Sequence, residues 1–184
     1  MAKITVYQPS GTSEVYRVRS RYSLRLWSVR HSRFLEIVYN LFADSLLALH
    51  PLWNWIGYAR VERPMVAVEK FTKEILFDCR MCGRCVLSST GMSCPMNCPK
   101  NLRNGPCGGV RADGHCEVEP DMPCVWVQAW QGSQRMKATS NILDVQKPVD
   151  HSIQGTSAWL RACSERAEEK IQERKEEKKQ EKSS

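Results

Sequence analysis

The sequence lacks the features that would place the chain across a membrane or outside the cell. No run of about 20 apolar residues free of charge occurs, so no membrane-spanning helix is predicted. The most apolar stretch, residues 34–58, is interrupted by Glu36, Asp44, His50 and Pro51. The N-terminus carries basic residues but not the roughly 7–15 apolar residues of a secretory signal. We therefore expect the chain to work in the reducing cytoplasm.

The sequence also lacks the repeating units of a barrel enzyme. A (β/α)8 barrel needs roughly 200–250 residues of alternating strand and helix, whereas this chain has 184 residues and no such alternation. No glycine-rich phosphate-binding loop follows a predicted strand. The chain by itself is therefore predicted to be non-catalytic, and any catalysis belongs to a partner.

Positive charge is in excess, with a formal net charge of +7 at pH 7. Much of it lies in residues 1–35, where seven basic groups face one acid, Glu14. A basic arm can bind nucleic acid or an anionic membrane surface. Cysteine thiolates that hold metal clusters would offset much of this excess, and the sequence has no basic recognition helix or paired finger spacing. We therefore predict no nucleic-acid partner.

The pattern of apolar residues predicts a mainly α-helical chain with irregular, metal-stabilised cysteine-rich loops. Residues 4–7 and 15–18 favour extended backbone and a short N-terminal β-hairpin. From Phe34, apolar residues at three- and four-residue steps predict an amphipathic helix that ends before Pro51. Its apolar stripe packs either on the domain's own core or on a second subunit. The stripe consists of Leu35, Val38, Phe42, Leu46 and Leu49.

Two further helices are predicted beside the cysteines. Pro64 suits the first turn of a helix that runs into Cys79, and its expected buried face is Met65, Val68, Phe71, Ile75 and Leu76. The other covers Cys124 to Trp130. We divide the chain into an N-terminal extension with an amphipathic helix (1–63), a cysteine-rich metal or iron–sulfur domain (64–130), an irregular wrap (131–160) and a charged tail (161–184). Like charges at four-residue spacing predict that this tail is a solvated helix, largely disordered alone.

Cysteine is the residue that the sequence has in excess. Eight of the nine cysteines lie between residues 79 and 124, and Cys163 stands apart as a plain thiol. The eight are Cys79, Cys82, Cys85, Cys94, Cys98, Cys107, Cys116 and Cys124. Secreted proteins use such a density for disulfides and intracellular proteins use it for metals. The segment is rich in glycine and proline and has no sustained period, so metal ligation would supply the free energy that orders it.

The spacing of these cysteines favours iron–sulfur clusters. Cys79, Cys82 and Cys85 form the closely spaced triple of bacterial ferredoxins, which a distant cysteine followed by proline completes. Two cysteines here precede a proline, Cys94 and Cys98. Zinc is the main alternative, although zinc ribbons have two separated Cys-x-x-Cys pairs. His115 could replace a thiolate in either case, or be an ordinary loop histidine.

Eight cysteines divide into two groups of four, which predicts two 4Fe-4S clusters. Our grouping assigns one cluster to Cys79, Cys82, Cys85 and Cys98, and the other to Cys94, Cys107, Cys116 and Cys124. The basic residues Lys100, Arg103 and Arg111 lie among these ligands. They could stabilise a reduced cluster, face an acidic partner or have no role.

The cysteine motifs resemble the methylenetetrahydrofolate reductase C-terminal domain family. The likeness is carried by Cys-Arg-Met-Cys-Gly-Arg-Cys at 79–85, Thr-Gly-Met-Ser-Cys-Pro-Met-Asn-Cys-Pro-Lys at 90–100, Leu-Arg-Asn-Gly-Pro-Cys-Gly-Gly at 102–109, Asp-Gly-His-Cys-Glu-Val at 113–118 and Cys-Val-Trp at 124–126. It is most specific across residues 64–130. The family includes the small cysteine-rich partner subunit of the acetogen-type reductase.

The resemblance implies a subunit that accompanies a flavin-dependent reductase. In that system a separate TIM-barrel subunit converts methylenetetrahydrofolate to methyltetrahydrofolate, and the small subunit is associated with its electron supply. The chain is then expected to bind neither folate nor flavin itself. Its clusters would accept electrons from a donor protein and pass them to the partner's flavin. A zinc-stabilised interaction module of the same complex is the alternative.

Overall fold

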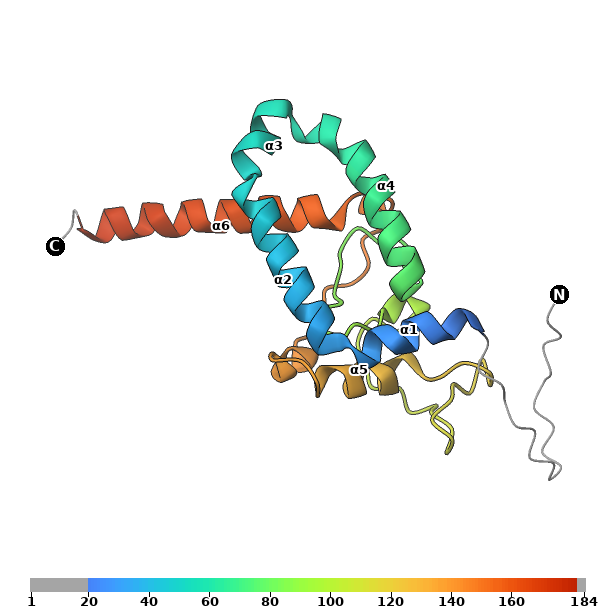
Figure 1. Cartoon of the computed structure of the whole chain (residues 1–184). Coiled ribbons are helices and arrows are strands. Elements are labelled where there is room, and N and C mark those ends of the chain that lie inside the picture. Colours follow the sequence, from blue (N-terminus) through green and yellow to red (C-terminus); the bar gives the residue numbers. More distant parts are fainter. Residues whose placement is uncertain (1–19, 182–184) are drawn as a thin grey trace, which may run out of the picture.

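The computed structural model describes residues 20–181, and these residues are mainly helical (Figure 1). This confirms the predicted mainly α class, whereas the predicted hairpin lies outside the described residues. The α-helices are α1 (Ser20–Arg30), α2 (Ser32–Ala48), α3 (His50–Ile56), α4 (Tyr58–Phe77), α5 (Val125–Ser133) and α6 (Ala158–Glu181). Three short 3-10 turns join them, η1 (Pro95–Asn97), η2 (Thr139–Leu143) and η3 (His151–Ile153).

The helices form an open frame around the cysteine-rich segment. In Figure 1, α2 and α4 form two sides that α3 joins at one end, and α6 crosses α2. α6 packs on α2, α3 and α4, while α1 packs on α4 and α5. The segment between α4 and α5 holds all eight clustered cysteines, has little regular structure and includes only isolated β-bridges among its described residues. The frame therefore has to hold this segment in place.

The sequence predicts two helices before the cysteines, and these correspond to α2 and α4 with different success. α2 ends at Ala48, before Pro51, as expected. α4 begins at Tyr58, so the prediction that Pro64 lies in its first turn is wrong. Gly57, with φ of 92°, turns the chain out of α3, and the helix restarts directly after it. Pro64 lies inside α4, where it lacks the N–H that would bond to the preceding turn.

The buried face of α4 is also not the one that its apolar pattern predicts. Val68, Phe71 and Ile75 are 58%, 70% and 46% exposed. The buried positions are instead Glu69 and Lys73, together with Phe77 at the end of the helix. This side of α4 meets the cysteine-rich segment and the beginning of α6, where polar partners are available to the two charged side chains.

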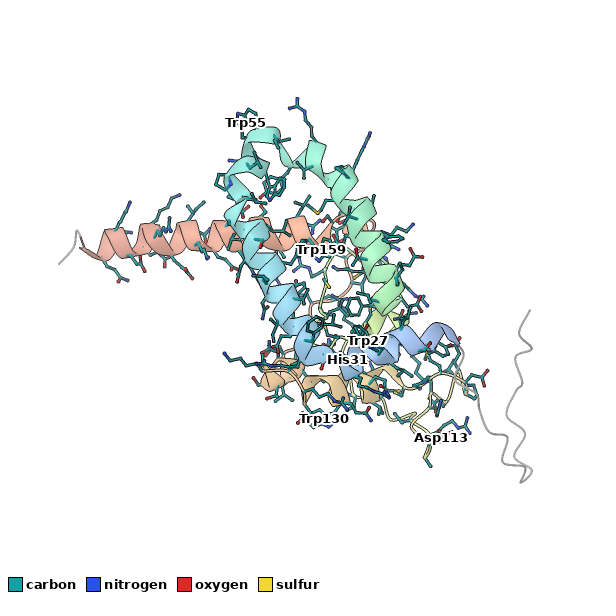
Figure 2. The ribbon with its side chains drawn as sticks, in the orientation of Figure 1. Trp27, His31, Trp55, Asp113, Trp130 and Trp159 are labelled. Carbon is teal, nitrogen blue, oxygen red and sulfur yellow. The ribbon has the colours of Figure 1, made fainter. Side chains whose placement is uncertain are left out.

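Helix α5 follows directly from the last clustered cysteine, as predicted, and extends to Ser133. Trp126 on this helix is 8% exposed, whereas Trp130, one turn later, is 54% exposed (Figure 2). Within the described residues, the predicted charged tail (161–184) forms most of α6, and its residues from Glu168 on are exposed. That this tail is largely disordered alone stays a prediction. Within residues 20–181, no helix has the length and apolar character that crossing a membrane requires.

The cysteine-rich segment packs backbone to backbone on α5. Gly91, with φ of 58°, lies against the carbonyl groups of Ala129 and Gly132 in α5. A Cβ atom on Gly91 would overlap the backbone of α5, and a Cβ atom on Gly132 would overlap the backbone of Gly91. Ser93 Oγ donates to the Val125 carbonyl at 3.0 Å, which fixes the same approach. Glycine is needed here for both its left-handed conformation and its lack of a side chain.

Candidate metal centre

Helix α4 delivers the first cysteine through a defined C-terminal cap. Asp78 adopts the left-handed conformation, with φ of 53° and ψ of 48°. Its N–H donates to the Glu74 carbonyl at 3.0 Å, and the N–H of Cys79 donates to the Lys73 carbonyl at 3.3 Å. The first of these bonds, from a left-handed residue to the carbonyl four residues earlier, is the αL cap that ends a helix, and the second fastens the next residue to the last turn. The turn directs Cys79 toward the interior of the frame.

The loop after Cys79 is tightly wound. Met81 and Gly83 both have positive φ, of 47° and 76°. The Met81 N–H donates to Cys79 Sγ at 3.4 Å, and the Met81 carbonyl accepts from Gly155 at 2.8 Å. A Cβ on Gly83 would overlap the Ile153 carbonyl, so the segment around η3 lies directly on the loop. Residues far along the chain thus cover the cysteine triple, as the predicted wrap would.

Four thiols surround one cavity, and we call them the first cysteine group: Cys79, Cys82, Cys85 and Cys94. The cavity is small, with a volume of about 20 Å³, and is partly open to solvent. Cys94 reaches it from the turn that follows Gly91, and Asn97 Nδ2 anchors the adjacent 3-10 turn to the Phe77 carbonyl at 2.8 Å. A backbone N–H, that of Met96, also donates to the sulfur of Cys94.

The cysteine that joins the triple at this cavity is Cys94, whereas the predicted grouping placed Cys98 there. Cys94 and Cys98 stand at opposite ends of η1, so this short turn sends their side chains to different places. Cys94 joins the cavity, while Cys98 packs with Cys116 among the apolar side chains of Tyr22, Met122 and Val125. The sequence could not separate the two because both precede a proline.

The other four cysteines, our second cysteine group, occupy two adjoining apolar clusters: Cys98 and Cys116 in one, Cys107 and Cys124 in the other. The isolated bridges between Val110 and Cys116 and between His115 and Pro123 draw this part of the segment together. Gly109 N–H donates to Cys107 Sγ at 3.4 Å. Cys107 also lies on an open apolar groove beside Trp126, Trp130 and Leu143.

The cysteines form no disulfide with one another. All nine are free thiols. In the described part of the chain, no three side chains of His, Cys, Asp or Glu meet closely enough to share one metal ion. The first cysteine group surrounds a space instead of a single point. Cys163 lies outside both groups, where its thiol donates to the Leu46 carbonyl at 3.3 Å.

The surroundings of both groups fit an inorganic cluster that is bound through cysteine sulfur atoms, which accept hydrogen bonds. Backbone N–H groups two residues after Cys79, Cys94 and Cys107 donate to the cysteine sulfur atoms, a contact that tunes iron–sulfur sites. Near the second group, Trp126 Nε1 and His115 Nε2 are buried without a hydrogen-bond partner among the described residues. Buried polar atoms are normally paired, and an ion or cofactor is one explanation when they are not.

Burial opposes the ionisation of two thiols of the first group, Cys79 and Cys94. Burial raises the pKa of Cys79 to about 11, although the Met81 N–H opposes this shift. Burial also raises the pKa of Cys94, and the charges of Cys79 and Cys85 add to the effect. Thiolate is the form that binds metal, so metal binding has to release protons and supply positive charge.

Of the three basic residues noted among the ligands, one borders the cavity. Arg103 is 8% exposed, and its guanidinium lies 3.8 Å from Cys82 Sγ and donates to the Arg84 and Lys147 carbonyls. Lys100 and Arg111 instead form ion pairs on the loops, with Glu117 and Asp113. These pairs are partly exposed, and such pairs contribute little to stability.

Sequence reasoning missed a second charged group at the cavity. Glu69 and Lys73, 1% and 3% exposed, form an ion pair at 2.6 Å and line the same cavity as the first cysteine group. Burial alone would lower the pKa of Lys73, but the charges of Cys85 and Glu69 outweigh it and raise that pKa. The only signal in the sequence is their four-residue spacing on a helix, which is common on solvated faces.

The part of the chain that contains both cysteine groups matches a known protein family. Residues 58–152, more than half of the chain, match the family described as methylene-tetrahydrofolate reductase C terminal. The chain belongs to this family. The matched range of this reductase C-terminal family member covers α4, both cysteine groups, α5, η2 and η3. Comparisons with curated proteins and with solved structures gave no match.

Proposed function

We propose that the chain is the iron–sulfur accessory subunit of a cytoplasmic methylenetetrahydrofolate reductase complex. The observation that carries the proposal is the gathering of four cysteine thiols around one cavity, inside the segment that matches the reductase family. Each cysteine group would hold one 4Fe-4S cluster, and the pair would supply electrons to a flavin in a separate TIM-barrel subunit. The same complex would serve one-carbon metabolism.

A cluster suits the first cysteine group better than a single zinc ion. Zinc needs its four sulfur atoms about 2.3 Å from one point, and no three candidate ligands in the described part of the chain meet in this way. A cubane binds each thiolate to a different iron, so its ligands surround a volume. That the four cysteines of the first group line one cavity supports a cluster there.

The bound clusters would accept and release one electron at a time. The residues of the chain hold them and set their surroundings. The positive φ at Met81 and Gly83 winds the loop around the cavity, and backbone N–H groups donate to the cysteine sulfur atoms. Helix α4 and the segment around η3 exclude water from one side. No side chain of this chain is required as nucleophile or general base.

The proposal is tested by electron transfer between the chain and its flavoprotein partner. The complex is purified anaerobically, the chain is reduced through a donor protein or chemically, and flavin bleaching is followed by stopped-flow absorbance. The wild-type chain should reduce the flavin, C94S should lose at least tenfold in rate, and C163S should match the wild type. Cys163 is a fair control because it is a buried cysteine outside both groups.

Two results would contradict the proposal. A colourless complex with zinc and no sulfide would indicate the zinc-stabilised interaction module, which supports the reductase physically and carries no electrons. A tagged chain that brings down no flavin-dependent reductase would remove the subunit assignment for both versions.

A further inference from the structure

We infer that Lys73 is a buried counter-charge that sets the reduction potential of the cluster at the first cysteine group, and that Glu69 positions it. This inference rests on the proposed function, because it concerns a cluster held by these four thiols. It assigns a role to two side chains of α4 that no cysteine motif identifies.

The first step is the location of Lys73. Its ammonium group is 3% exposed and lines the cavity that the four thiols surround. Its strongest charge partners include Cys85 and Cys79. A cation in such a place is rare, because burying an ammonium group is unfavourable unless nearby negative charge compensates it. Thiolates that carry a cluster would provide that charge.

The second step is how Glu69 holds the lysine. Glu69 Oε1 accepts from Lys73 Nζ at 2.6 Å, while Oε2 accepts from Ser157 Oγ at 2.6 Å and from Trp159 N–H at 3.3 Å. Both carboxylate oxygens are therefore engaged, and the lysine cannot swing away without leaving one of them unpaired. Trp159 also lies 5.0 Å from the ammonium group, as a cation–π contact (Figure 2).

The third step is the balance of charge around the pair. The carboxylate of Glu69, a residue of α4, accepts a hydrogen bond from the first turn of α6. A helix N-terminus carries partial positive charge. Lys73 and this helix end share one carboxylate, so Glu69 does not neutralise the whole of the positive charge beside the cavity. Positive charge near a cluster favours its reduced, more negative state and raises its reduction potential.

The experiment compares K73M with three other variants in the full chain. K73R keeps the charge, and K70M makes the same chemical change at an exposed position on the same helix. E69Q/K73M removes both charges, so that no carboxylate is left buried without its partner. The readouts are iron and sulfide content and the midpoint potential of each cluster, measured by EPR during a redox titration. The first cluster is the one whose signal C94S lacks.

In K73M the midpoint potential of the first cluster should shift to a more negative value, while that of the second cluster stays in place. K73R and K70M should both match the wild type. Should K73M fail to keep the first cluster, E69Q/K73M decides, and it should show a negative shift that is smaller than that of K73M, because the loss of the Glu69 charge offsets part of the loss of the lysine. An unchanged potential in K73M or in the double variant overturns the inference, as does a K73R shift as large as that of K73M.

The proposed function and the inference about Lys73 can be overturned separately. A wild-type chain without EPR-active clusters removes the proposed function, and the inference falls with it. If the wild-type chain holds two clusters and substitution of Lys73 leaves both midpoint potentials unchanged, only the inference is overturned.

Discussion

The two cysteine groups have different surroundings. The first lines a cavity bordered by buried charge, from Lys73, Glu69 and Arg103. The second is set among apolar side chains such as Tyr22, Met122 and Trp126, and one member, Cys107, lies on an open apolar groove. Since charge and solvent access are what tune an iron–sulfur site, two clusters held here would differ in potential. The first, beside buried cations, would be the easier to reduce.

The groups also differ in what holds them. The first is fixed by elements from across the chain: the end of α4, the 3-10 turn η1 and the segment around η3. The second relies mainly on contacts within residues 98–129, apart from Tyr22 of α1 and Ile142 of η2. The helical frame therefore supports the first group more directly, and damage to the two should have different consequences.

The largest effect is expected from cysteine replacement. C94S and C79S should each lose about half of the iron, because four thiolates hold each cluster. The double variant C79S/C94S should lose no more than either single variant, whereas C94S/C98S should lose nearly all of it. Iron and acid-labile sulfide analysis after anaerobic purification measures this.

These variants also test whether each cysteine belongs to the group to which it is assigned. Additive loss in C79S/C94S, together with no further loss in C79S/C98S beyond that of either single variant, would return Cys98 to the first group. C163S should keep its full iron content, because Cys163 donates to the Leu46 carbonyl and lies at neither group.

A smaller effect is expected from the glycine that supports the first group. In G91A the left-handed backbone and the overlap with α5 should together lower the free energy of unfolding by roughly 2–5 kcal/mol. Gly114, near the second group, has φ of 82° but open space around it, so G114A should lose only about 1–2 kcal/mol. Denaturant unfolding of the two variants measures the difference, and equal losses would show that the close approach to α5 contributes nothing.

The smallest effect concerns pH in the metal-free chain. Burial raises the pKa of Cys79 from 9.0 to about 11. Below pH 9 the thiol is neutral in both states; above it, ionisation favours the unfolded chain first. Stability should therefore fall as pH rises from about 9 to about 11, by at most about 2 kcal/mol. C79A should show a shallower fall in denaturant unfolding at the same pH values, and an identical curve would place the titration elsewhere.

The sequence predicted the helical class and the cysteine segment but not their internal arrangement. Periodicity located the end of α2 and most of α5, because both combine an apolar stripe with a clear terminus. It failed on α4, where the buried positions are Glu69 and Lys73 and the apolar residues Phe71 and Val68 are exposed. Apolar patterning assumes that a helix buries its apolar side, whereas the buried side of α4 carries an ion pair, Glu69 with Lys73, that finds polar partners in the fold.

The candidate site was predictable in composition and not in grouping. Spacing alone identified the triple that begins at Cys79, since its members are close in sequence. The fourth member is decided by η1, three residues that separate Cys94 from Cys98 and send them to different neighbours. The charged residues at the cavity lie before and after the cysteine motifs, on α4 and in the loop at Arg103. Only the folded chain brings them together.

The central claim is that these thiols hold inorganic clusters, and metal and sulfide content measures it most directly. The chain, purified without oxygen alone or with its flavoprotein partner, should contain about eight irons and about eight acid-labile sulfides, and should be brown. Zinc in place of iron, without sulfide, would contradict the account.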